Sequence, residues 1–202
     1  MRRVLPLVLA VLLLAGCAVG AGGGGEDFDR YRLPSCGDGK GTVRVPLLIL
    51  MAQAVPSASQ VPCVDPAHLT ADWTVSDVFV RNGRARFALD SELGPGHHAV
   101  VVVLERTCTF GKVTRVPSDH PGLQRYQEIT EIQSGRRFRG AIHYLFRGGC
   151  VTYELDFRGG EQARPLGDVV LALGFVSRDA IAATLREYTD GRVSLDPPGG
   201  RR

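Results

Sequence analysis

Residues 73–90 read WTVSDVFVRNGRARFALD, and this stretch decides the fold class. Apolar and polar side chains alternate on both sides of Asn82-Gly83, and a period of two is typical of β-strands that are covered on one face. Asn-Gly suits the two central positions of a tight hairpin turn, where φ is positive. The stretch therefore predicts an antiparallel hairpin with strands at 73–81 and 84–90.

The hairpin register predicts which side chains share a face, because neighbouring residues on a strand point to opposite sides. One face is expected to be apolar and to hold Val78, Val80, Ala85 and Phe87. The opposite face is expected to be wet and charged, with Asp77, Arg81, Arg84 and Arg86.

Further strands follow the hairpin at short intervals. Residues 98–106 (HAVVVVLER) are apolar on both faces, which is typical of a central strand. Alternating segments then come at 126–132, 137–146 and 150–157, separated by glycine-containing turns. Five or six strands joined by short turns predict an antiparallel meander. We expect three strands to be near neighbours, namely 99–105, 139–146 and 150–157.

The C-terminal part changes to helical periodicity. Ser177 is a suitable N-cap, and Asp179 places negative charge in the first turn. Apolar residues then recur at i, i+4 and i+7, and Gly191 follows as the end signal. The pattern predicts a helix over 178–190 that packs on one face of the sheet. The expected fold class is therefore α+β.

Three other segments are less clear in their periodicity. Residues 42–55 are apolar and fit a buried strand that runs into a short helix ending before Pro56. Residues 169–176 fit either a strand or a buried helix. Residues 192–196 fit a short edge strand.

The first residues have the form of a secretory signal. Arg2 and Arg3 precede an apolar run over 4–14, which is too short to span the roughly 30 Å hydrocarbon core. The run ends in Leu14-Ala15-Gly16-Cys17, which resembles the lipobox of bacterial lipoproteins, in a chain whose preference for arginine over lysine is typical of high-GC bacteria. This resemblance implies lipid on the Cys17 sulfur and cleavage before Cys17. It places the protein on the extracytoplasmic face of the cell membrane, held there by lipid.

The remaining chain reads as one tethered domain. We expect a signal peptide at 1–16, a lipidated cysteine and glycine-rich tether at 17–30, a single globular domain at 31–198 and a tail at 199–202. Without the signal peptide, 22 basic residues face 21 acidic ones. Because a nucleic-acid binder usually has a clustered basic excess, this balance argues against one.

Four cysteines remain after Cys17, an even number in a chain expected to be exported. Four cysteines allow three disulfide pairings, and we favour Cys36–Cys63 and Cys108–Cys150 because each is local to one region of the chain. A four-cysteine zinc site is the alternative, but such sites usually carry CxxC pairs, and no two of these cysteines lie closer than 27 positions.

No motif for catalysis, a metal or a cofactor is present. We expect no metal and no cofactor, name no catalytic residue, and leave enzymatic activity as the less favoured alternative. The polar residues that most suggest a binding site are arginines on or next to the strands expected at 137–146 and 150–157. They are Arg137, Arg139, Arg147 and Arg158, and Arg136 lies beside them. Gathered on one side of a sheet, they would bind carboxylate or phosphate. Alternatively they form a solvated face that is neutralised by neighbouring acids, namely Glu128, Glu131, Glu154 and Asp156.

Two functional classes follow. The first is a binding or accessory module of the cell envelope that meets a protein or an acidic polymer. The second is a surface hydrolase whose site is assembled from dispersed residues, such as Asp77, His98, His120 and His143. Ser118-Asp119-His120 holds the residue types of a hydrolase triad, but three consecutive residues rarely reach triad geometry, so we interpret it as a turn.

Overall fold

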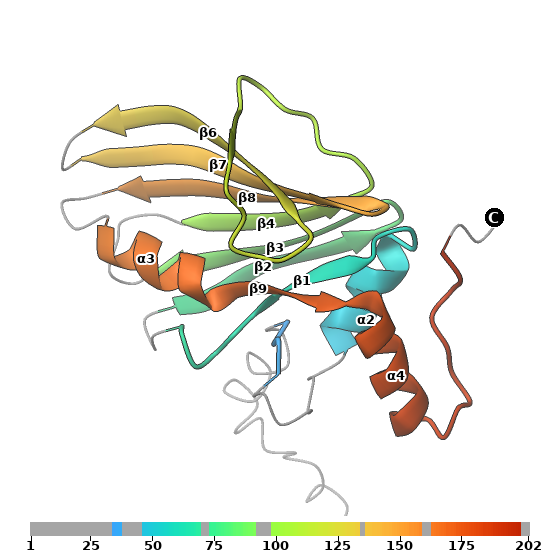
Figure 1. Cartoon of the computed structure of the whole chain (residues 1–202). Helices are drawn as coiled ribbons and strands as arrows, with labels where there is room; N and C mark the ends of the chain where they lie inside the picture. Colours follow the sequence, from blue (N-terminus) through green and yellow to red (C-terminus); the bar gives the residue numbers. More distant parts are fainter. Residues whose placement is uncertain are drawn as a thin grey trace, which may run out of the picture.

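The structure is a computed structural model, and it describes residues 34–37, 46–69, 73–91, 98–133, 136–158 and 163–198. The predicted signal peptide, Cys17 and the tether lie outside these ranges. The body of the fold is a seven-stranded antiparallel sheet (Figure 1). Its strands are β2 (Trp73–Arg81), β3 (Arg84–Ser91), β4 (Val100–Glu105), β5 (Thr114–Val116), β6 (Gln124–Gln133), β7 (Arg137–Phe146) and β8 (Gly149–Arg158).

The predicted hairpin is confirmed as β2 and β3. Val78 pairs with Phe87 and Val80 with Ala85, as the alternation required. Gly83 has a φ of 84°, which glycine adopts without strain. A bulge between Val75 and Asp77 shifts the register toward the start of β2.

The strand order corrects the simple meander. It runs β2-β3-β4-β8-β7-β6-β5, so two antiparallel runs meet where β4 pairs with β8. The chain leaves β4, crosses to the far edge at β5 and returns strand by strand. The sheet also has seven strands rather than five or six, because the three-residue β5 is too short to show a periodicity. β4 lies inside the sheet between β3 and β8, as expected for a strand that is apolar on both faces, and β7 follows on the far side of β8.

A second layer covers one face of the sheet, which we call the inner face; it carries Phe87, Val102 and Tyr153. The layer consists of a two-stranded sheet, β1 (Gln60–Val64) with β9 (Leu173–Ser177), and helix α3 (Ala163–Ala172), which cross in front of the larger sheet in Figure 1. Helix α2 (Pro46–Ala54) completes the core with the buried Leu48 and Met51. The opposite, outer face carries the charged side chains discussed below.

The C-terminal helix is present as α4 (Arg178–Tyr188). The Ser177 side chain accepts a hydrogen bond from the Ala180 backbone N–H at 3.1 Å, so the predicted cap is confirmed. The helix does not lie across the large sheet as expected. It packs on α2 and β9, beyond the end of the sheet (Figure 1), because β1, β9 and α3 already cover the inner face.

Of the three uncertain segments, the first is described only from residue 46, so the strand expected at its start lies outside the described residues. Residues 46–54 form a helix, with proline at its first position, where no N–H is needed. Residues 169–176 combine both alternatives, since α3 runs directly into β9. The edge strand expected at 192–196 is wrong: the Asp196 backbone N–H donates to the Gln53 side chain at 3.0 Å, and its carbonyl accepts from Arg178 at 2.6 Å.

Two disulfides connect the cysteines as the sequence analysis favoured. Cys36 is bonded to Cys63 with a Cα–Cα distance of 4.9 Å, which fastens residues 34–37 to β1. Cys108 is bonded to Cys150 with a Cα–Cα distance of 5.6 Å. This disulfide holds the segment after β4 against the start of β8. Among the described helices, none has the length and apolar character needed to cross a membrane.

Candidate functional site

Three of the four predicted binding arginines meet on the outer face of the sheet. Arg137 and Arg139 lie two positions apart on β7 and therefore point to the same side. In the register with β8, Arg137 pairs with Arg158 and Arg139 pairs with Asp156. The pairing of β7 with β8 thus brings four charged side chains to one corner of the sheet. We call Arg137, Arg139, Arg158 and Asp156 the arginine corner.

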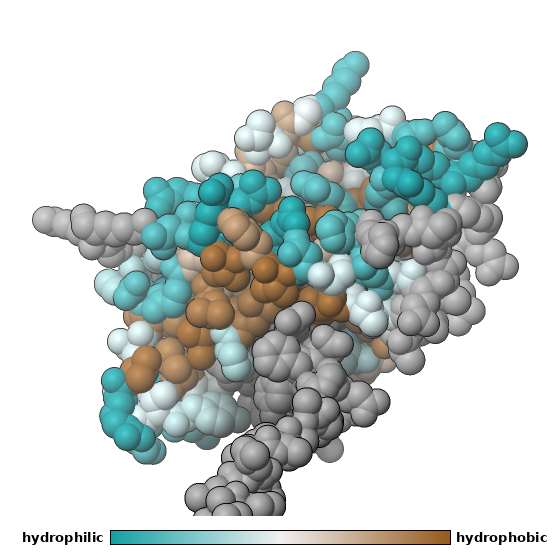
Figure 2. Space-filling model, turned by 180° about the vertical axis from the view of Figure 1, so that it is seen from behind, coloured by the Kyte–Doolittle hydropathy of each residue, from teal (hydrophilic) through white to brown (hydrophobic). Residues whose placement is uncertain are grey.

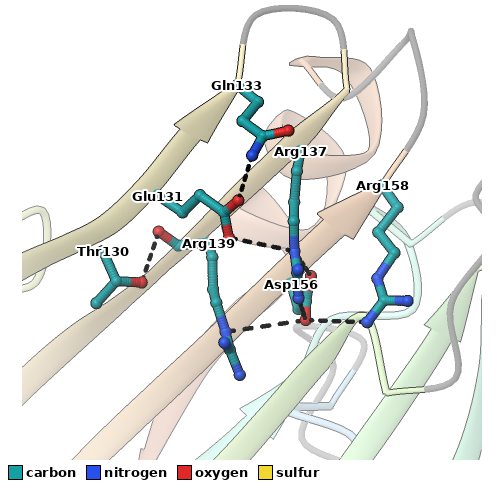
Figure 3. Close-up of polar contacts among 7 residues, drawn as sticks. All are labelled: Thr130, Glu131, Gln133, Arg137, Arg139, Asp156 and Arg158. Carbon is teal, nitrogen blue, oxygen red and sulfur yellow. Dashed lines mark hydrogen bonds and ion pairs between the residues drawn. The ribbon is translucent and has the colours of Figure 1, made fainter.

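The Asp156 carboxylate is the centre of this corner, with the three guanidinium groups turned toward it (Figure 3). Arg137 donates from Nε to Oδ1 at 3.1 Å and from Nη2 to Oδ2 at 2.8 Å, a bidentate pair. The Nε of Arg139 is 3.9 Å and the Nη2 of Arg158 is 3.6 Å from the same Oδ2. Arg137 is held firmly, and the other two are only loosely paired.

The charges of the corner do not cancel. Hydrogen bonding to Arg137 lowers the pKa of Asp156, although partial burial opposes this, so the carboxylate is ionised at neutral pH. Glu131 adds a second carboxylate 3.5 Å from Arg137. Two acids therefore face three arginines, and the side chains of Arg139 and Arg158 are 58% and 54% exposed. The corner presents two available guanidinium groups to solvent.

Arg147 does not belong to this group. It lies in the turn between β7 and β8, at the end of these strands away from Arg137 and Arg158. The Arg147 carbonyl accepts a hydrogen bond from Ser59 N–H at 3.0 Å, and its side chain is exposed. The sequence identified the right residue type on both strands, but the predicted set of four is divided between two ends of the sheet.

A hollow of about 360 Å³ adjoins the corner. Its floor includes Ala141, which pairs with Glu128 of β6 on one side and with Glu154 of β8 on the other. Arg139 and Asp156 form its boundary with the arginine corner. Acidic and basic side chains thus alternate along this face, so part of the neutralisation expected from neighbouring acids is present.

His143 lies on the same face but is shielded. Its Nδ1 is 3.0 Å from the Thr152 hydroxyl, and its Nε2 is 3.9 Å from Glu128. Phe110 contacts the ring edge-on at a centroid distance of 4.9 Å, and burial lowers the pKa of the imidazole despite the nearby Glu128. The contact with a carboxylate resembles a general-base pair, but the imidazole is almost completely covered and has no access to a substrate.

The segment 118–120 is a turn, as interpreted from the sequence. The Ser118 hydroxyl donates to the His120 carbonyl and accepts from the His120 backbone N–H, rather than facing an imidazole. The Asp119 carboxylate accepts hydrogen bonds from the Tyr144 hydroxyl at 2.8 Å and from Arg125 at 2.9 Å. Its neighbour His120 packs on Tyr144 and on Phe175 of β9, which is on the inner face. This cluster fastens the loop to the core.

The residues suggested for a hydrolase therefore do not form one site. His143 and His120 lie on opposite faces of the sheet. Asp77 bonds to Arg86 on β2 and β3, at the edge of the sheet that is far from β6. His98 borders the hollow. Among the residues that the structure describes, no three His, Cys, Asp or Glu side chains gather as a metal ion would require.

The central role of Asp156 was not predicted from the sequence. This residue was named only as a possible neutralising neighbour, and its role as the shared partner of three arginines depends on the register of β7 with β8. The only sequence signal was the alternation of charge in 154–158, which placed Asp156 and Arg158 on one face.

Comparisons with known proteins do not extend this description. No protein-family model, no curated protein and no solved structure matches the chain.

Proposed function

We propose that this protein is a lipid-anchored binding module of the cell envelope, which holds an acidic partner at the arginine corner on its extracytoplasmic domain. The observation that carries the proposal is the pair of exposed, loosely paired guanidinium groups of Arg139 and Arg158 on either side of Asp156. Guanidinium groups bind carboxylate and phosphate through paired N–H donors. The partner is therefore expected to offer repeated carboxylates or phosphates, as an acidic polymer or an acidic protein surface does.

Asp156 supports this role by positioning the corner. Its carboxylate fixes Arg137 through two hydrogen bonds and keeps the other two guanidinium groups close together against their mutual repulsion. An incoming anion would have little to displace, since Arg139 lies 3.9 Å from Asp156 and Arg158 holds it only weakly at 3.6 Å. This arrangement favours weak, salt-sensitive binding of a partner with many anionic groups. It does not favour binding of a single anion in a deep pocket.

The binding experiment compares two variants that lose the same charge. Retention of the full chain is measured on immobilised polyphosphate and on immobilised polyglutamate as salt is raised. Arg139→Ala/Arg158→Ala should elute at lower salt than wild type. The control Arg147→Ala/Arg192→Ala removes two exposed arginines from elsewhere and should elute close to wild type. Equal losses in both variants would show that only overall charge matters and would contradict the proposed site.

The lipid anchor has a separate test. The proposal requires Cys17 as the lipid acceptor, so Cys17→Ser should abolish both labelling by radioactive palmitate and retention in the membrane fraction. Equal labelling of the variant and the wild type would refute the anchor. The binding experiment does not depend on this result, because the arginine corner lies in the folded domain.

A further inference from the structure

Strand β2 forms one edge of the seven-stranded sheet. In the part of the chain that the structure describes, no strand pairs with its outer side. An edge strand presents a row of N–H and C=O groups that can pair with another strand, and proteins usually protect such edges by charge, proline or bulges. β2 has a bulge between Val75 and Asp77, but its last five residues, Asp77–Arg81, continue in regular register with β3. This half of the strand can accept another strand.

The hairpin turn determines which backbone groups face outward. In a two-residue hairpin, the residues that flank the turn exchange hydrogen bonds, and bonded and non-bonded pairs then alternate along the ladder. Arg81 and Arg84 flank the turn and form the first bonded pair, and Phe79 with Arg86 forms the next one. The backbone N–H and C=O groups of Arg81 and Phe79 therefore point inward to β3. Val80 and Val78 therefore direct their N–H and C=O groups away from the sheet.

The sequence of this half-strand is complementary to itself. When two copies pair antiparallel about Phe79, Val78 of each copy lies opposite Val80 of the other, and both residues offer outward backbone groups. The same register places Asp77, which Arg86 of β3 already holds within each copy, opposite Arg81 twice, and it places Phe79 opposite Phe79. Opposite charges and aromatic pairs directly across two strands are stabilising.

The apolar side chains at this edge are unusually exposed. Val78, Phe79 and Leu50 of α2 are 37%, 45% and 54% exposed, and the Arg81 guanidinium lies over the Phe79 ring at 5.5 Å. Figure 2 shows an apolar area in the middle and lower part of the outer face, the face to which Phe79 points, whereas Val78 and Leu50 point to the inner side of this edge. Isolated apolar residues are normal on a surface, but a group at an open edge indicates an interaction site.

Space for a second strand is present beside β2. A hollow of about 460 Å³ lies between α2 and the strand, lined by Leu47, Leu50, Val75 and Val78 among others. In the register about Phe79, Val80 of the second copy points to the same side as Val78 and would enter this hollow. The lining also includes Ser76 and Asp77, so Val80 of the second copy would contact its apolar part, formed by Leu47, Leu50 and Val78.

From these observations we infer that two copies of this chain associate through antiparallel pairing of residues 77–81 of β2 about a two-fold axis at Phe79. The contact is isologous, so it closes as a dimer and does not propagate into a filament. The seven-stranded sheets of the two copies become one continuous sheet of twice the width. This inference does not rest on the proposed binding function, because the arginine corner lies on β7 and β8, which β3 and β4 separate from β2.

The decisive experiment places a cysteine on the two-fold axis. In the full chain carrying Phe79→Cys, the two new thiols would be direct cross-strand neighbours, with Cβ atoms about 5 Å apart, close enough to form a disulfide. Mild oxidation should give a covalent dimer on a non-reducing gel. The control Thr74→Cys is on the same strand and also exposed, but in this register its two copies are far apart, so it should stay monomeric. No dimer from Phe79→Cys, or equal dimer from both variants, would overturn the inference.

A charge exchange in the Phe79→Cys background tests the register. Arg81→Glu places two acids opposite each other at both ends of the contact and should lower the cross-linked yield about tenfold, because like charges directly opposite are destabilising. Asp77→Lys together with Arg81→Glu restores opposite charges and should recover the dimer. An unchanged yield in Arg81→Glu would overturn the proposed pairing of Asp77 with Arg81.

Discussion

Arg178 and Arg139 carry the same guanidinium group in opposite surroundings. Arg178, at the start of α4, is 5% exposed and donates to two backbone carbonyls, those of Ala52 and Asp196. Arg139, on the outer face, is more than half exposed and stands 3.9 Å from its nearest carboxylate. Buried arginine with fixed acceptors joins segments of the fold, whereas exposed arginine without them is free to bind something else.

Two further arginines lie between these extremes. The Arg125 side chain is 15% exposed, bonds to Asp119 and lies over the Tyr144 ring at 5.7 Å. Arg137 is less covered but is held bidentately by Asp156. We therefore expect the loss of stability on substitution to fall from Arg178 through Arg125 to Arg139, while the loss of partner binding rises in the same order.

The largest loss of stability is expected for Arg178→Met. This change keeps the length of the side chain but leaves the carbonyls of Ala52 and Asp196 without their donor. Buried acceptors left unsatisfied cost about 1–3 kcal/mol each, so we expect the free energy of unfolding to fall by about 2–4 kcal/mol. Urea denaturation measures this change, with the exposed Arg186→Met on the same helix as the control. Equal losses in the free energy of unfolding for the two variants would mean that Arg178 does not join α4 to α2.

Arg125→Gln should have an intermediate effect. The change removes an ion pair with Asp119 and the contact with Tyr144, but Asp119 keeps its hydrogen bond from the Tyr144 hydroxyl and is partly exposed. Because solvent screens the pair, we expect a loss of only about 1 kcal/mol. Thermal unfolding compares it with Arg115→Gln on the adjacent β5, which is exposed. A loss as large as that of Arg178→Met would show that the loop of Asp119 is more tightly coupled to the core than its contacts indicate.

This series also explains how much of the molecule the sequence could predict. The hairpin, the central β4 and the cap of α4 follow from local patterns, such as Asn82-Gly83 and Ser177, that do not depend on distant residues. The same holds for the residue types of the arginine corner, since Arg137 and Arg139 alternate within one strand.

Contacts between segments far apart in the chain were not predictable in this way. The sequence around Arg178 reads as an ordinary helix start, and its burial depends on α2 and Asp196, which lie distant in sequence. Likewise, β4 pairs with β8 rather than β5, and Arg147 is separated from Arg158 by the length of the strands. Arginine chemistry is visible in a sequence, but its surroundings are set by long-range register.

Asp156→Asn tests the acidic centre of the corner, with a modest effect that depends on pH. Arg137 lowers the pKa of Asp156 in the folded state relative to about 3.9 in an unfolded chain. The ionised carboxylate therefore contributes stability above about pH 4, and this contribution is lost as pH falls through the folded pKa. The variant should be less stable than wild type by up to about 1 kcal/mol at pH 7, with the two converging in acid. A difference that grows in acid would contradict the pairing with Arg137.

The smallest change in stability is expected for Arg139→Ala/Arg158→Ala, the variant used in the binding experiment. Both side chains are more than half exposed and lie beyond hydrogen-bond distance from Asp156, so their removal should alter the free energy of unfolding by less than about 0.5 kcal/mol. Removing two positive charges beside Arg137 even relieves some repulsion. Calorimetry should thus find that the midpoint of thermal unfolding is nearly unchanged in this variant, although its retention on immobilised acidic polymer is lost. If the midpoint instead falls as far as in Arg178→Met, these arginines join the strands of the sheet, and the contrast between buried and exposed arginine does not hold at this corner.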